Sequence, residues 1–93
     1  ALVNGPDGKT AHLFTADEHG DAVVGVEFLV AEGSNSGVYL MGRYEIQVFD
    51  SYGVEKPEHS DCGGIYQRYI EGEGKGYEGR PPRVNASKKP GEW

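Results

Sequence analysis

The stretch VYLMGRYEIQVF, residues 38–49, decides the fold class of this 93-residue chain. Two short runs rich in apolar and aromatic residues flank Gly42-Arg43, a pattern that is typical of a β-hairpin. Successive side chains of a strand point to opposite faces of the sheet. The second arm is therefore predicted to have a core face, made of Tyr44, Ile46 and Val48, and a largely polar face, made of Arg43, Glu45, Gln47 and Phe49.

The remainder of the chain is predicted to form further short strands joined by many turns. Fifteen glycines and five prolines argue against a helix bundle. Apolar alternation predicts a half-buried strand over residues 22–31, and shorter runs predict strands over residues 11–15 and 64–70. The Gly- and Pro-rich residues 71–82 are predicted to contain neither a helix nor a central strand. These patterns together predict an all-β fold.

Composition excludes several classes of protein. Hydrophobic residues make up 37% of the chain, which predicts a thin core. A net charge of -6 repels phosphates, so nucleic acid is not an expected partner. No apolar run approaches the roughly 20 residues that a membrane helix needs, so no membrane span is expected. The single cysteine, Cys62, cannot form an intramolecular disulfide, is predicted to be a small packed residue, and leaves the compartment open.

Four segments of the chain, in this order, resemble the 3-keto-disaccharide hydrolase domain family. The first two segments run on almost without a gap, and the set covers the sequence from about Gly20 to its end, which makes the resemblance specific. The segments are residues 35–40 (NSGVYL), 43–51 (RYEIQVFDS), 62–66 (CGGIY) and 84–93 (VNASKKPGEW).

The resemblance implies a fold and a location. The fold is an antiparallel β-sandwich, a jelly roll of the concanavalin A-like and glucanase type, with a concave polar face that binds carbohydrate. Such domains usually belong to exported bacterial proteins, so a periplasmic or extracellular location is expected. Family domains are longer than this chain, and residues 1–93 are therefore expected to be a single, partial domain whose remaining strands follow Trp93.

The resemblance also implies a reaction. Family members are associated with cleaving glycosides already oxidised to a ketone at carbon 3, which acidifies the hydrogen on carbon 2. A base removes that proton, a hydrogen-bond donor or a metal stabilises the enolate, and an acid assists the departing oxygen. The expected activity of the full-length domain is that of a hydrolase or lyase on 3-keto-glycosides. The alternative is a noncatalytic carbohydrate-binding module on the same sandwich.

The polar face of residues 43–49 offers candidate catalytic groups. Side chains at positions i, i+2 and i+4 of a strand stand about 7 Å apart from one to the next, so they can span a sugar ring. Glu45 is the candidate base or metal ligand, Gln47 a partner for hydroxyl groups, and Arg43 a cation for the ketone or enolate. The alternative is a solvated strand face on which Arg43 and Glu45 form an ion pair.

Asp50 is a weaker candidate for binding substrate. It lies five positions after Glu45, so it points to the opposite face of a regular strand and joins the polar face only through a bulge. The alternative is a turn cap to Ser51 or Tyr52. Gln47 stands where sandwich-fold glucanases carry an acid, which argues against hydrolysis by two carboxylates.

Aromatic and loop residues complete the set of candidates. Tyr39 and Tyr66 are candidate platforms for a sugar ring or, alternatively, filling between the sheets. Asn35 either binds a sugar hydroxyl or supplies the turn before Gly37. No cofactor is demanded by the sequence, and a divalent metal ion is the one candidate. His59 and Asp61 can ligate it, together with Glu45, if their loop folds back over the strand, and they are otherwise solvated loop residues.

Overall fold

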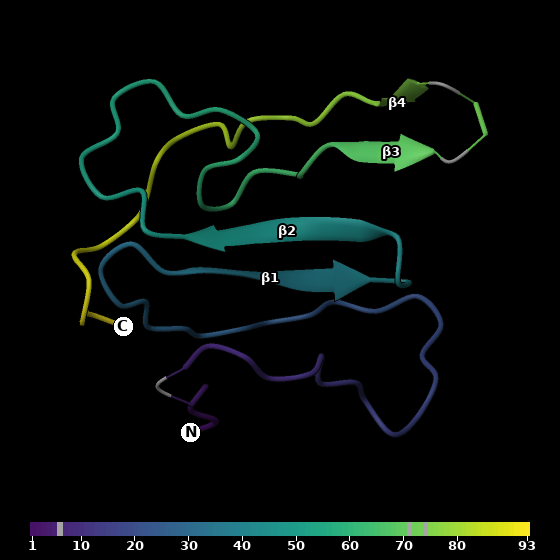
Figure 1. The fold of residues 1–93 in the computed structure, drawn as a ribbon, viewed down its shortest axis with the longest axis horizontal. Coiled ribbons are helices and arrows are strands. Elements are labelled where there is room, and N and C mark those ends of the chain that lie inside the picture. The colour runs from purple at the N-terminus through teal and green to yellow at the C-terminus, as the bar shows by residue number, and fades with distance from the viewer. Residues whose placement is uncertain (6, 71, 74) are drawn as a thin grey trace.

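The fold consists of antiparallel β-hairpins, as a computed structural model shows (Figure 1). The structure describes residues 1–5, 7–70, 72–73 and 75–93. Within these residues there are strands and turns but no helix. The strands are β1 (Asn35–Leu40), β2 (Tyr44–Phe49), β3 (Arg68–Ile70) and β4 (Lys75–Tyr77). The prediction of an all-β, antiparallel fold is confirmed.

The hairpin of β1 and β2 forms where the sequence predicts it. The two strands pair antiparallel, with Leu40 opposite Tyr44 and Val38 opposite Ile46. The turn between them is closed by a hydrogen bond from the Arg43 amide to the Leu40 carbonyl. Its central residues, Met41 and Gly42, have φ values of 55° and 59°. Two positive φ values are those of a type I′ turn, whose twist matches that of the strands. The turn therefore centres on Met41-Gly42, one residue earlier than predicted.

Residues 63–66 extend the sheet beyond β2. Ile65 bridges to Ile46 on one side and to Arg80 on the other, antiparallel in both cases. The Gln47 amide donates to the Gly64 carbonyl at 2.9 Å, and the Gln47 carbonyl accepts from the Gly63 amide at 2.8 Å. The chain runs from Ile65 into β3 and returns from β4 to Arg80. The hairpin of β3 and β4 therefore lies next to β2, and the two hairpins form one row of chain segments (Figure 1).

Two predictions for the strands need correction. Residues 11–15 and 22–31 form no strand within the described structure, although the second range has an alternating pattern. Val24 there is 58% exposed. A strand needs a partner for its backbone groups, and within the described structure the backbone of residues 22–31 is joined to a distant segment by a hydrogen bond from the Gly91 amide to the Val30 carbonyl. Strand β4 lies within residues 71–82, and it pairs with β3 alone, so it is not a central strand and the prediction for this range needs no correction.

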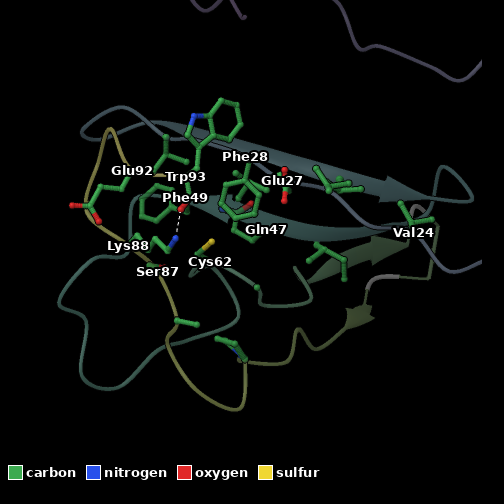
Figure 2. Close-up of a pocket in the computed structure, with 18 of the residues that line it drawn as sticks. Val24, Glu27, Phe28, Gln47, Phe49, Cys62, Ser87, Lys88, Glu92 and Trp93 are labelled. Carbon is green, nitrogen blue, oxygen red and sulfur yellow. Dashed lines mark hydrogen bonds between the residues drawn. The ribbon is translucent and has the colours of Figure 1, made fainter. Parts of the chain in front are cut away.

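The apolar face of β1 and β2 borders an open hollow. Among the described residues Val48 is the one hydrophobic side chain that is buried, with 7% of its surface exposed, so the prediction of a thin core is confirmed. The hollow has a volume of about 730 Å³ and is lined by side chains from the strands, from residues 24–30 and from the C-terminal segment. Val24 and Glu92 lie toward its opposite ends (Figure 2).

A buried polar cluster fixes the loop between β2 and residue 64. Ser51 is fully buried, and its hydroxyl donates to Asp61 Oδ1 at 2.9 Å and accepts from the Cys62 amide at 3.0 Å. Asn85 Nδ2 donates to the carbonyls of Ser51 and Val54 at 2.7 and 2.9 Å. These bonds fasten the C-terminal segment to the loop and hold the loop against the sheet. The loop carries His59 over the polar face of the sheet.

Candidate functional site

The polar face of the β1–β2 hairpin brings three predicted site residues into one line. Tyr39 of β1 lies directly opposite Glu45 of β2. On the other side of β2, the Tyr66 amide donates to the Glu45 carbonyl at 2.9 Å. Residues opposite each other in antiparallel pairing share a face of the sheet. Tyr39, Glu45 and Tyr66 therefore form a line across three neighbouring chain segments.

The Glu45 side chain is held in one orientation. Its Oε2 atom accepts a hydrogen bond from the Tyr39 hydroxyl at 2.9 Å. A Cβ atom added to Gly37 would lie 2.8 Å from both Cγ and Cδ of Glu45, so the side chain lies directly across the bare backbone of that glycine. A larger residue at position 37 would push the side chain away. Oε1 is the carboxylate atom nearest to Gly37, and among the described side chains none donates a hydrogen bond to it.

The hydrogen bond also defines the protonation of Tyr39. The pKa of the Tyr39 phenol is raised above 10.0, chiefly because its hydroxyl donates to Glu45, and further by burial and by the charges of Glu45 and Tyr66. Ionising the phenol would bring a negative charge next to a carboxylate. Tyr39 therefore remains a hydrogen-bond donor at neutral pH. Its ring is 52% exposed, so the same residue also presents an open aromatic surface.

Gln47 lies on the same face of the sheet as Glu45, but the backbone of the loop covers it. Only 3% of its surface is exposed, and its Nε2 donates to Asn35 Oδ1 at 3.2 Å. A Cβ atom on the neighbouring Gly64 would lie 2.9 Å from the carbonyl carbon of His59, so the loop backbone covers this part of the sheet. Asn35, the first residue of β1, is exposed and lies outside the turn that closes with Ala31 and Ser34. In this arrangement Gln47 supports Asn35.

Arg43 and Asp50 lie outside the line of site residues. Arg43 closes the hairpin turn and is exposed, so it is not part of the strand face on which it was predicted. Within the described structure, Glu45 bonds to Tyr39 and forms no ion pair with Arg43. Asp50 Oδ2 accepts from the Gly33 amide at 2.9 Å. Asp50 thus braces the turn before β1, and its partner is Gly33 and not the neighbouring Ser51 or Tyr52 that the turn-cap alternative named.

Asp61 and His59, the candidate metal ligands of the loop, contact different groups. Both carboxylate oxygens of Asp61 accept hydrogen bonds within the loop, from the Ser51 hydroxyl and from the Glu58 amide. His59 instead places its ring edge-on to Tyr66, with 5.4 Å between centroids and 80° between planes. In the part of the chain that the structure describes, no group of three or more His, Cys, Asp or Glu residues is arranged to hold a metal ion. The predicted metal site finds no support in this geometry.

Sequence reasoning missed three residues that shape this face. Gly37 and Gly79 make room for the side chains of Glu45 and His59. His12, from a segment without regular structure, places its ring 5.9 Å from that of Tyr39. A glycine in a strand can signal close approach of other groups, but which group approaches depends on strand register and on the path of the loop.

The fold and this face define an all-β protein with an oriented carboxylate between aromatic side chains on an open sheet surface. The sequence model of the 3-keto-alpha-glucoside-1,2-lyase-like domain matches residues 1–93, and the chain belongs to this family. The resemblance seen in the four sequence segments is therefore confirmed, with the jelly-roll type of fold that it implies. No curated protein and no solved structure matches the chain. The described residues contain no helix long and apolar enough to cross a membrane.

Proposed function

We propose that the polar face around Glu45 binds a glycoside oxidised to a ketone at carbon 3 and eliminates its aglycone. The observation that carries this proposal is the line of Tyr39, Glu45 and Tyr66, in which the carboxylate is oriented by one phenol. Membership in the 3-keto-alpha-glucoside-1,2-lyase-like family supports the choice of substrate and reaction. The resemblance to exported glycoside-degrading proteins supports an extracytoplasmic location as part of the same proposal.

Glu45 is the base in this proposal. The carboxylate takes the proton from carbon 2, which the neighbouring ketone acidifies, and the electron pair of the broken C–H bond becomes an enolate. The enolate reforms the ketone as a carbon 1–carbon 2 double bond appears and the bond to the aglycone breaks. The departing oxygen then takes the proton that Glu45 received, and water can add to the product afterwards. Tyr39 keeps the carboxylate oriented throughout, because its hydrogen bond fixes Oε2.

A noncatalytic carbohydrate-binding module is the second candidate. The favouring observation is that the hollow of about 730 Å³ borders the apolar face of the hairpin, whereas Tyr39 and Tyr66 are exposed on an open polar surface. Exposed aromatic rings on an open surface suit the binding of sugar rings. A module of this kind would bind sugar and leave it intact.

The test compares the intact wild-type protein with a Glu45→Gln variant. Aglycone release is measured from a 3-keto-glucoside and from the same glucoside without the ketone, each with and without a chelator of divalent metals. We expect release from the ketone by the wild type, a loss of at least about 100-fold in the variant, and retained sugar binding by NMR titration. Glu55→Gln, in an exposed part of the loop, is the matched control. No release by the wild type under any condition would favour the binding module.

A further inference from the structure

A second polar group stands beside the Glu45 carboxylate on the hairpin. Successive side chains of a strand alternate between its faces, so Asn35, Gly37 and Tyr39 of β1 share one face. The Tyr39 hydroxyl donates to the Glu45 carboxylate, which lies over Gly37. Asn35 is the next residue of β1 on this face, on the side of Gly37 away from Tyr39. The carboxylate therefore has the phenol on one side and the side-chain amide of Asn35 on the other.

The side-chain amide of Asn35 has a defined orientation. Gln47 Nε2 donates to Asn35 Oδ1 at 3.2 Å, and the Gln47 side chain is buried. Because Gln47 lies on the face of Glu45, this bond places the Asn35 amide on that face too. A buried amide hydrogen without an acceptor is unfavourable, so the bond keeps the Asn35 oxygen turned toward Gln47.

The amide of Asn35 therefore presents its NH2 group as a donor. With Oδ1 engaged, Nδ2 and its hydrogens point away from Gln47. Among the hydrogen bonds of the described residues, none has Asn35 Nδ2 as its donor. Asn35 is exposed, so a bound sugar can accept a hydrogen bond from this group.

The separation of the carboxylate and this donor suits one sugar ring. Positions two residues apart on a strand are about 7 Å apart, and this is the spacing along β1 between Asn35 and Gly37, on which the carboxylate lies. A base lies about 3 Å from the carbon whose proton it takes, and a donor lies about 3 Å from its acceptor. Carbon 3 is bonded to carbon 2, so a base for carbon 2 and a donor to the carbon-3 oxygen can lie about 5–8 Å apart.

We propose that Asn35 is a catalytic residue whose Nδ2–H donates a hydrogen bond to the carbon-3 oxygen of the enolate, with its amide oriented by Gln47. The inference rests on the proposed function and adds an oxyanion donor to Glu45. When the carbon 2–hydrogen bond breaks, the proton goes to Glu45 and the electron pair places negative charge on the carbon-3 oxygen. The Asn35 donor stabilises this charge and itself neither gains nor loses a proton. The charge leaves the oxygen as the ketone reforms and the aglycone departs.

The expected effect is that of an oxyanion donor. A fixed donor aimed at developing charge contributes about 100- to 1,000-fold to kcat. The ketone oxygen of bound substrate carries little charge, so KM should change much less than kcat. Exchange of the carbon-2 hydrogen in deuterium oxide, followed by NMR, reports enolate formation separately from cleavage. The probe for this exchange is 3-keto-1,5-anhydroglucitol, which has no aglycone to lose.

The experiment compares the intact wild-type protein with two variants of Asn35. Asn35→Asp keeps the shape of the side chain and can still accept from Gln47, but it has no N–H donor. Asn35→Ala removes the amide without adding a charge. We expect kcat on a 3-keto-glucoside and the rate of carbon-2 exchange to fall by about 100-fold or more in both variants. Asn4→Asp, in an exposed segment, is the matched control and should behave as the wild type does. A kcat for either Asn35 variant within about threefold of wild type, which is less than 1 kcal/mol of transition-state stabilisation, would overturn the inference.

A second measurement covers the case in which the Asn35 variants fail to fold. NMR of the wild-type protein follows the side-chain NH2 groups while 3-keto-1,5-anhydroglucitol is added. We expect the NH2 resonances of Asn35 to shift and those of Asn4 to stay in place, whereas an unshifted Asn35 amide in the sugar-bound protein would refute the assignment. Failure of the wild type to cleave 3-keto-glucosides counts against the proposed function. Cleavage that does not depend on Asn35 counts against this inference alone.

Discussion

Ser51→Ala should destabilise the protein more than any exposed serine substitution. The Ser51 hydroxyl is fully buried, donates to Asp61 and accepts from the Cys62 amide. A hydrogen bond to a charged group contributes about 1.5–3 kcal/mol, and one between neutral groups about 0.5–1.5 kcal/mol. Removing the hydroxyl leaves both partners unsatisfied, so the free energy of unfolding should fall by about 2–4 kcal/mol, a large part of the ~5–15 kcal/mol that stabilises a typical domain.

Urea denaturation of the intact protein, followed by circular dichroism and tyrosine fluorescence, measures this change. Ser36→Ala is the matched control, because Ser36 is an exposed residue of β1, and it should change the free energy of unfolding by less than about 0.5 kcal/mol. The loop should also become accessible to protease in Ser51→Ala. Equal unfolding free energies for Ser51→Ala and Ser36→Ala would refute the reasoning that a buried polar cluster holds the loop.

Three further predictions concern the site and the contacts that position it. The pKa of Tyr39 is raised in the folded state, so its contribution to stability is complete below pH 10.0 and is lost as the pH rises through the raised pKa. The Tyr39→Phe variant should lack this loss. Urea denaturation of the wild type and the variant below and above pH 10.0 measures it, and an equal change in the free energy of unfolding for both proteins would show that the prediction is wrong. Gly37→Ala should displace Glu45 and lower kcat on a 3-keto-glucoside by about 10- to 100-fold, whereas Gly25→Ala, with open space around its Cβ, should not. Asn85→Ala should lower the free energy of unfolding by about 1–3 kcal/mol, and an unchanged urea midpoint would contradict this.

The parts of the fold that the sequence predicts are those set by local patterns. Alternation between Glu45 and Val48 fixes the two faces of β2, because side-chain direction follows from the strand itself, whereas Arg43 lies in the turn and Phe49 lines the hollow. The same alternation in residues 22–31 is not sufficient for a strand, since the ladder requires a partner that the described structure does not supply. Strand β4 was missed for the converse reason, because pairing with β3 overrides its Gly-rich sequence.

The same distinction holds for the site residues. Those placed by a single strand could be predicted, whereas those placed by a turn or by a distant loop could not. Glu45 could be predicted as the central group, because its position on the polar face follows from β2 alone. Arg43 could not be excluded, because the centre of the turn depends on Met41 adopting a positive φ. His59 was considered only as a metal ligand, since its contact with Tyr66 and Gly79 arises from a loop whose path the buried Ser51 hydroxyl determines.

The role of Glu45 is tested most directly by aglycone release from a 3-keto-glucoside, measured for the intact wild-type protein and for Glu45→Gln at matched folded concentrations. The wild type is expected to release the aglycone from the ketone and not from the unoxidised glucoside. The variant should bind the ketone and release aglycone at least about 100-fold more slowly. Equal release by both proteins would contradict the assignment of Glu45 as the base.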